Sequence, residues 1–151
     1  IILAASLFIM AAPTFAQKVC LEITSSDLQI KTRVHDIALA DLGKINRFDV
    51  NDGAGWNCYT LEIIADPVLD AYDATRTGLV GITAFFLRSA KCQYQPTDAP
   101  IGCNALRGSF PVTVLRRSLI EVRIASIVQQ FAEFPAMEQK AKSQYLLEKQ
   151  K

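Results

Sequence analysis

The chain has one histidine, His35, and lacks the short motifs of the common enzyme classes. It contains no Gly-x-Ser-x-Gly elbow, no Walker-type phosphate loop, no Gly-x-Gly-x-x-Gly fingerprint and no His-Glu-x-x-His helix. General bases and nucleophiles are therefore scarce. Carboxylate chemistry of the kind used by glycosidases stays open, but the sequence offers no acidic pair that we would assign to it.

An excess of charge of one sign is also missing. Sixteen basic and fifteen acidic residues give a net charge of +1, so electrostatics give no argument for binding nucleic acid or an anionic membrane. His35 precedes Asp36 in an expected helix, where adjacent side chains point about 100° apart. We therefore expect a surface or boundary histidine without an orienting carboxylate.

Residues 1–16 lack any charged side chain. They end with Thr14 and Ala16 at the positions that a signal peptidase reads, so we interpret them as a signal peptide. An initiating Met and a basic segment are absent, and we expect this signal peptide to be truncated at its N-terminus. A membrane anchor is the alternative, but the apolar segment falls short of the roughly 20 residues that span a bilayer.

Four cysteines follow the expected cleavage site, at Cys20, Cys58, Cys92 and Cys103. An even number in an exported chain favours two disulfides, for which three pairings exist. We favour Cys92 with Cys103, because a bridge would close the loop between them at its base, and this leaves Cys20 with Cys58. A zinc site is the alternative, but no Cys-x-x-Cys pair is present. We expect no metal and no cofactor.

Residue patterning predicts a central pair of strands. Residues 59–65 alternate apolar and polar side chains, and residues 79–87 are apolar on both faces, which is typical of a strand covered on both sides. Further strands are expected at 19–24, 45–50 and 105–115, the last with Phe110, Val112 and Val114 in alternation.

Two helices are predicted at 26–43 and 118–134 from apolar residues at helical spacing. Capping boxes mark their starts, Ser26 with Gln29 and Ser118 with Glu121. Pro135 is expected to interrupt the second helix, leaving residues 136–151 as a charged helical or frayed tail.

These elements predict an α+β fold with the order β-α-β-β-β-(β)-α. We expect a four- to five-stranded mixed or antiparallel sheet packed by two helices, as a two-layer or three-layer sandwich. Removing 16 residues from 151 leaves 135, which suits a single domain, placed at 17–135. The strand that is apolar on both faces requires both helices, or one helix and a partner, to cover it.

The connection at 68–78 is the candidate binding loop. It combines Asp70, Tyr72, Asp73 and Arg76, and binding residues often lie in such loops. A solvated hairpin end is the alternative interpretation.

Two segments carry a resemblance to known proteins. Residues 36–48 run from a helix through a glycine into a strand, and residues 120–134 contain Val128-Gln129-Gln130-Phe131. With the element order, they resemble small exported bacterial proteins without an assigned activity. The order is also similar to that of the N-terminal domain of TolB, an envelope assembly protein, at the level of fold only.

We therefore expect a periplasmic or secreted binding or envelope-assembly module, more consistent with a non-catalytic role than with an enzyme. The expected partner is another protein of the cell envelope, with no nucleic acid and no stable membrane span after cleavage, and oligomerisation stays open. A small secreted hydrolase using loop carboxylates is one alternative, and it requires a deep pocket holding acids with raised pKa. An inhibitor-type protein is the other, marked by an exposed apolar patch near residues 66–78.

Overall fold

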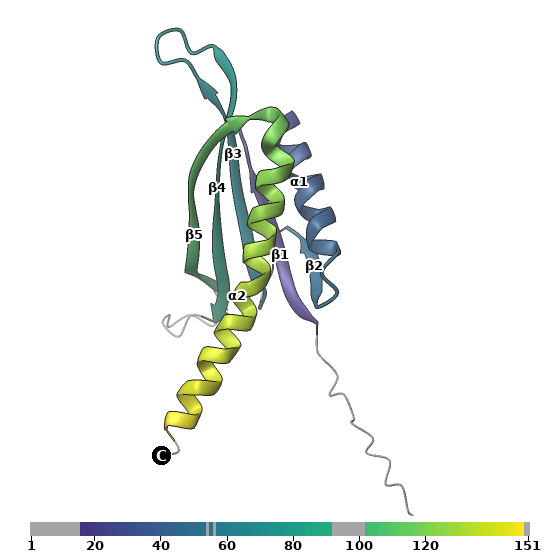
Figure 1. The fold of residues 1–151 in the computed structure, drawn as a ribbon, viewed down its shortest axis with the longest axis vertical. Helices are drawn as coiled ribbons and strands as arrows, with labels where there is room; N and C mark the ends of the chain where they lie inside the picture. The colour runs from purple at the N-terminus through teal and green to yellow at the C-terminus, as the bar shows by residue number, and fades with distance from the viewer. Residues whose placement is uncertain (1–15, 54, 56, 92–101, 150–151) are drawn as a thin grey trace, which may run out of the picture.

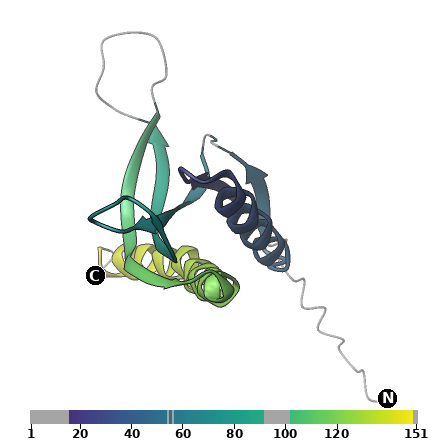
Figure 2. The same cartoon turned by 90° about the horizontal axis from the view of Figure 1, so that it is seen from above.

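The computed structural model contains one five-stranded mixed sheet with two helices on the same side of it (Figures 1 and 2). The structure describes residues 16–53, 55, 57–91 and 102–149, so most of the expected signal peptide lies outside it. The elements are β1 (Gln17–Thr24), α1 (Leu28–Gly43), β2 (Phe48–Asp52), β3 (Tyr59–Leu69), β4 (Arg76–Lys91), β5 (Gly102–Arg116), η1 (Arg117–Leu119) and α2 (Ile120–Glu148). The predicted α+β class and element order are confirmed, in the two-layer form.

The sheet order is β2-β1-β3-β4-β5. Strand β1 is parallel to both β2 and β3, whereas β4 is antiparallel to both β3 and β5. The parallel half thus comes from the β1-α1-β2 unit and the return from β2 to β3, and the antiparallel half from the consecutive strands β3, β4 and β5.

One face of the sheet and one face of each helix form the hydrophobic core. Leu61, Ile63 and Ala65 of β3 and Val80, Ile82 and Ala84 of β4 are fully buried, as alternation predicts. From the helices, the buried residues are Ile30, Val34, Ala38 and Leu42 of α1 and Ile120, Ile124, Ile127 and Phe131 of α2. Both predicted helical faces therefore pack on the same side of the sheet.

Neither helix starts with the predicted capping box. The N-cap of α1 is Asp27, whose Oδ1 accepts hydrogen bonds from the backbone N–H groups of Gln29 and Ile30 at 2.9 and 3.1 Å. The N–H of Ser26 instead donates to Asp66 Oδ1 at 2.6 Å. Helix α2 follows the 3-10 turn η1 without a side-chain cap.

Helix α2 continues through Pro135, so the predicted interruption there is wrong. An interior proline removes a backbone hydrogen bond and destabilises a helix by about 3 kcal/mol or more. Tertiary contacts on both sides of it hold the helix in place. The Arg47 guanidinium donates to the Ala132 carbonyl before the proline, and Arg88 pairs with Glu138 after it.

The antiparallel strands are longer and less regular than predicted. Strand β3 does not end at Asp66 and Pro67 but continues to Leu69, with a register irregularity after the proline. In β5, three residue steps from Phe110 to Thr113 face two steps of β4, which is a bulge containing Pro111. The bulge breaks the predicted alternation, because Phe110 packs against the core while Val114 is exposed.

The connection from β2 to β3 crosses β1 on the face away from the helices. A disulfide joins Cys20 of β1 to Cys58 at its end, with 5.8 Å between the Cα atoms. A Cβ placed on Gly55 would lie 2.5 Å from Cys20 Sγ, so the crossing chain rests on the disulfide. This is the expected pairing of Cys20 with Cys58. Cys92 lies outside the described residues, and its pairing with Cys103 stays a prediction.

Candidate binding surfaces

The face of the sheet away from the helices, here the open face, carries apolar side chains on three adjacent strands. They are Ile64 and Val68 of β3, Phe85 and Leu87 of β4, and Leu106, Val112 and Val114 of β5. Leu106, Val112 and Val114 are 59%, 68% and 55% exposed. Neither described helix covers this second apolar face of β4 (Figure 2).

At Gly81 the apolar side chains of β3 and β5 approach each other across β4, because glycine has no side chain between them. Val68 Cγ2 and Val112 Cγ1 each lie 3.9 Å from the position that a Cβ on Gly81 would take. Six positions further along β4 from Gly81, Leu87 is the register partner of Leu106. The strip therefore follows the outer face of β4, and Thr83 and Ser109 are polar positions within it.

Two glutamates border this strip. Glu22 of β1 and Glu62 of β3 are register partners on parallel strands and point to the same face. Glu62 is in turn the register partner of Phe85. Both glutamates are half-buried, and none of the ion pairs found among the described residues involves either of them.

In the predicted binding loop, the two aspartates build the turn. Asp70 Oδ1 accepts a hydrogen bond from the N–H of Tyr72 at 2.8 Å. Asp73 Oδ1 accepts from both the N–H and the hydroxyl of Thr75, at 2.9 and 2.7 Å, and the hydroxyl bond is the main cause of the lowered pKa of Asp73. Tyr72 itself is 99% exposed at the tip of the hairpin.

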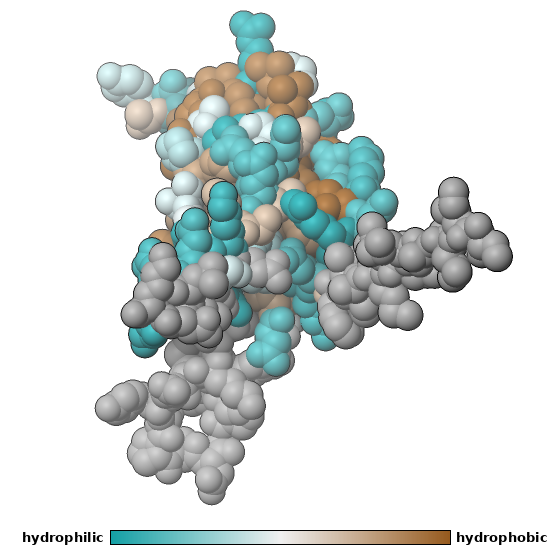
Figure 3. Space-filling view, turned by 60° about the horizontal axis from the view of Figure 1, so that its bottom comes forward, coloured by the Kyte–Doolittle hydropathy of each residue, from teal (hydrophilic) through white to brown (hydrophobic). Residues whose placement is uncertain are grey.

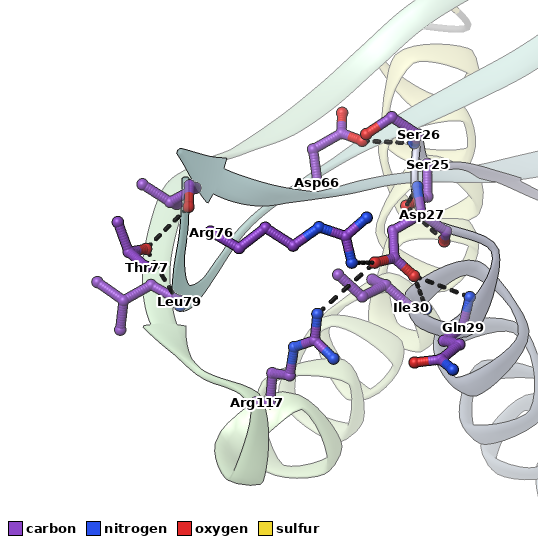
Figure 4. Close-up of polar contacts among 11 residues, drawn as sticks. Ser25, Ser26, Asp27, Gln29, Ile30, Asp66, Arg76, Thr77, Leu79 and Arg117 are labelled. Atoms are coloured by element: carbon purple, nitrogen blue, oxygen red, sulfur yellow. Dashed lines mark hydrogen bonds and ion pairs between the residues drawn. The ribbon is translucent and has the colours of Figure 1, made fainter. Parts of the chain in front are cut away.

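Arg76, the fourth predicted residue of this loop, reaches back to Asp27 (Figure 4). Its guanidinium lies 2.6 Å from Asp27 Oδ2, and that of Arg117 lies 3.6 Å from the same oxygen. The N–H of Ile30 is the largest cause of the lowered pKa of Asp27, and both arginines add to it. Sequence reasoning identified neither Asp27 nor Arg117, whose roles depend on three chain segments meeting at one end of the sheet.

The four residues of the predicted loop thus do not converge on one point. Asp70 and Asp73 shape the turn and Arg76 ties the hairpin to α1, which leaves Tyr72 projecting into solvent. The loop stays a candidate surface through this single aromatic side chain.

His35 joins α1 to the end of β2. Its Nε2 lies 2.9 Å from Asp52 Oδ1 and its Nδ1 lies 3.2 Å from Asp36 Oδ1. His35 lies at the boundary, as expected, but the expectation that Asp36 would not orient its ring is wrong, because the carboxylate reaches Nδ1 despite the divergence of adjacent helix positions. The bond to Asp52 is the largest cause of the raised pKa of His35.

The helix side also exposes apolar groups. Figure 3 shows hydrophobic residues gathered at the top of its view, among mostly hydrophilic ones. Leu28 of α1 and Val122 of α2 are 77% and 69% exposed, and a shallow hollow between the helices is bordered by the Arg33–Glu121 ion pair.

Within the described residues, no cluster of histidine, cysteine and acidic side chains fits a metal ion, and no helix is long and apolar enough to span a membrane.

No protein-family model matches the chain, and no curated protein matches it. Among solved structures it is similar to the rare lipoprotein B from Shewanella oneidensis, with 16% sequence identity. The alignment covers 85% of this chain and 98% of that chain, with a TM-score of 0.20.

Proposed function

We propose that the chain is an exported, non-catalytic binding module that docks another protein of the cell envelope on its open face. The observation that carries this proposal is the apolar strip over β3, β4 and β5, whose three aliphatic side chains on β5 are more than half exposed. Soluble proteins that function alone rarely leave a contiguous apolar surface of this kind uncovered. A protein partner would supply the second cover that the two-sided strand β4 lacks.

The disulfide supports an extracytoplasmic location. Cys20 and Cys58 are only 1% and 2% exposed, and buried structural disulfides form in oxidising compartments. Together with the apolar residues 1–16, this favours the periplasm or secretion.

The edges of the sheet favour docking on its face. The outer strand β5 contains Pro111 and two register irregularities, which interrupt the regular backbone that an added strand needs. At the other edge, β2 is short and carries Asp49 and Asp52. A partner would therefore gain more by packing side chains on the open face than by extending the sheet.

Among the described residues, the two carboxyl groups with a shifted pKa do not support the hydrolase alternative. A general acid at neutral pH needs a raised pKa, whereas Asp27 and Asp73 are both shifted downward by hydrogen bonds that favour the charged form. The inhibitor-type alternative has one observation in its favour. Leu69 and Tyr72 at the hairpin end are 50% and 99% exposed.

A pair of valines offers a matched test of the proposed function. Val112 lies on the open face and Val122 on the helix side, and they are 68% and 69% exposed. We expect a photo-crosslinking amino acid at position 112, introduced in the cell that exports the chain, to give a discrete protein adduct. The same residue at position 122 should give none. Equal adducts at both positions, or none at 112, would refute docking on the open face.

A further inference from the structure

We infer that the segment docked on the open face is a basic amphipathic helix, whose aliphatic side chains cover the strip and whose lysine or arginine residues meet Glu22 and Glu62. The inference rests on the proposed function and specifies the chemistry of the partner. It follows from charge complementarity at one border of the apolar strip, from the position of the chain's own cations and from the register of the strands.

The two glutamates are placed where they repel each other. Neighbouring strands lie about 4.8 Å apart, and like charges opposite each other on one face destabilise a sheet. Glu22 and Glu62 occupy such positions and are half-buried. A cation arriving from outside the domain would relieve this repulsion, and it would bind more strongly in this partly desolvated position than at a fully exposed carboxylate.

Several cations of the chain pair with other acids, and Arg116, which the register places on the open face, lies opposite Leu79, six positions along β4 from Phe85. Arg33 pairs with Glu121, Arg76 and Arg117 pair with Asp27, and Arg88 pairs with Glu138. Lys18 is the basic residue of β1, but it lies four positions from Glu22, which is roughly 13 Å along a strand. That distance exceeds the Debye length of about 8 Å at physiological ionic strength, so Lys18 neutralises the pair poorly.

Acidic and apolar groups follow one another across the sheet. At one level the register places Glu22, Glu62 and Phe85 side by side, and the next outward-facing level of β4 and β5 is formed by Leu87 and Leu106. A helix lying along β4 would present an aliphatic stripe to the strip and a basic flank toward β1. An extended segment would gain little, because it needs a regular sheet edge for its backbone hydrogen bonds.

The sheet face also discriminates against an anionic lipid surface. A membrane with acidic headgroups would bring negative charge against Glu22 and Glu62, and the whole chain carries a net charge of only +1. A polypeptide with separate apolar and basic stripes satisfies both parts of the surface.

Two synthetic helical peptides test this inference. They share a leucine face, and their polar faces carry lysine in one and glutamate in the other. We expect the exported chain, purified from cells, to bind the lysine peptide at least tenfold more tightly in fluorescence anisotropy. In the Glu22→Gln/Glu62→Gln variant this preference should fall below about threefold. The variant Glu133→Gln/Glu148→Gln removes the same charge from exposed positions of α2 and should keep the full preference.

Each part of the inference has an outcome that overturns it. Equal affinity for both peptides, or an unchanged preference after Glu22→Gln/Glu62→Gln, would contradict the inference that the partner is basic. Val112→Glu should weaken binding of the lysine peptide and Val122→Glu should not, so an unaffected Val112→Glu variant places that binding elsewhere. A protein adduct at position 112 that persists after Glu22→Gln/Glu62→Gln would keep the proposed function and reject only this inference. Unchanged melting temperatures of the variants exclude misfolding as the cause of lost binding.

Discussion

Asp27 illustrates how one side chain joins three parts of the fold. Its Oδ1 caps α1, and its Oδ2 faces Arg76 of the β3–β4 hairpin and Arg117 of η1 (Figure 4). The sequence alone offered Ser26 as an equally good cap by residue type. The choice is made by Asp66, forty positions away, which takes the N–H of Ser26. A contact at that sequence distance leaves no local signal.

His35 makes folding stability depend on pH. Because Asp52 and Asp36 raise its pKa in the folded state, the protonated ring stabilises the fold fully below its ordinary value of about 6.5. This contribution is lost as the pH rises through the higher pKa of His35 in the folded state. We expect His35→Gln to lose about 0.5–1 kcal/mol of unfolding free energy near pH 5.5 and less near pH 8.5, as measured by urea denaturation. Asp52→Asn should remove most of this dependence on pH, and parallel pH profiles for wild type and His35→Gln would contradict the assignment.

At the scale of elements, the spacing of apolar residues predicted which faces of the helices and of β4 are buried, because these faces depend on residues close together in the chain. The core faces of α1 and α2 and the two-sided apolar character of β4 follow directly from spacing. The face on which Val112 and Val114 lie could not be predicted from spacing, because the bulge at Pro111 is defined only by the pairing of β5 with β4. Passage of α2 through Pro135 likewise depends on Arg47 and other distant contacts. The open face, which is the main candidate site, was thus predictable from β4 and not from β5.

The packing of α2 on the sheet is tested by a pair of substitutions in one helix. Ile127 is fully buried, whereas Val122 is 69% exposed. We expect Ile127→Asp to unfold the domain, because an unpaired charge in a dry core destabilises by several kcal/mol. Val122→Asp should change the unfolding free energy by less than about 0.5 kcal/mol. Thermal melting followed by circular dichroism distinguishes the two, and an Ile127→Asp variant with the wild-type melting temperature would rule out this packing.

At the scale of the whole molecule, the crossing between β2 and β3 sets the limits of the open face. The crossing chain and the Cys20–Cys58 bridge lie against the outer face of β1, where Cys20 is only 1% exposed. The aliphatic side chains of the strip that are more than half exposed lie on β5, at the far edge of the sheet. Glu22 and Glu62 lie on β1 and β3, one outward-facing level from Cys20. The bridge therefore limits what a partner can contact on β1.

Removal of that disulfide tests how the crossing is held. The bridge spans 38 positions in sequence, and the chain-entropy model gives a loss of about 4 kcal/mol for a loop of this length. We expect Cys20→Ala/Cys58→Ala to lower the unfolding free energy by about 2–4 kcal/mol in chemical denaturation. Gly55→Ala should destabilise the wild type, because its Cβ would lie 2.5 Å from Cys20 Sγ. The same substitution should be much milder in the Cys20→Ala/Cys58→Ala background, where that sulfur is gone. Equal effects of Gly55→Ala in both backgrounds would mean that the crossing chain does not rest on the disulfide.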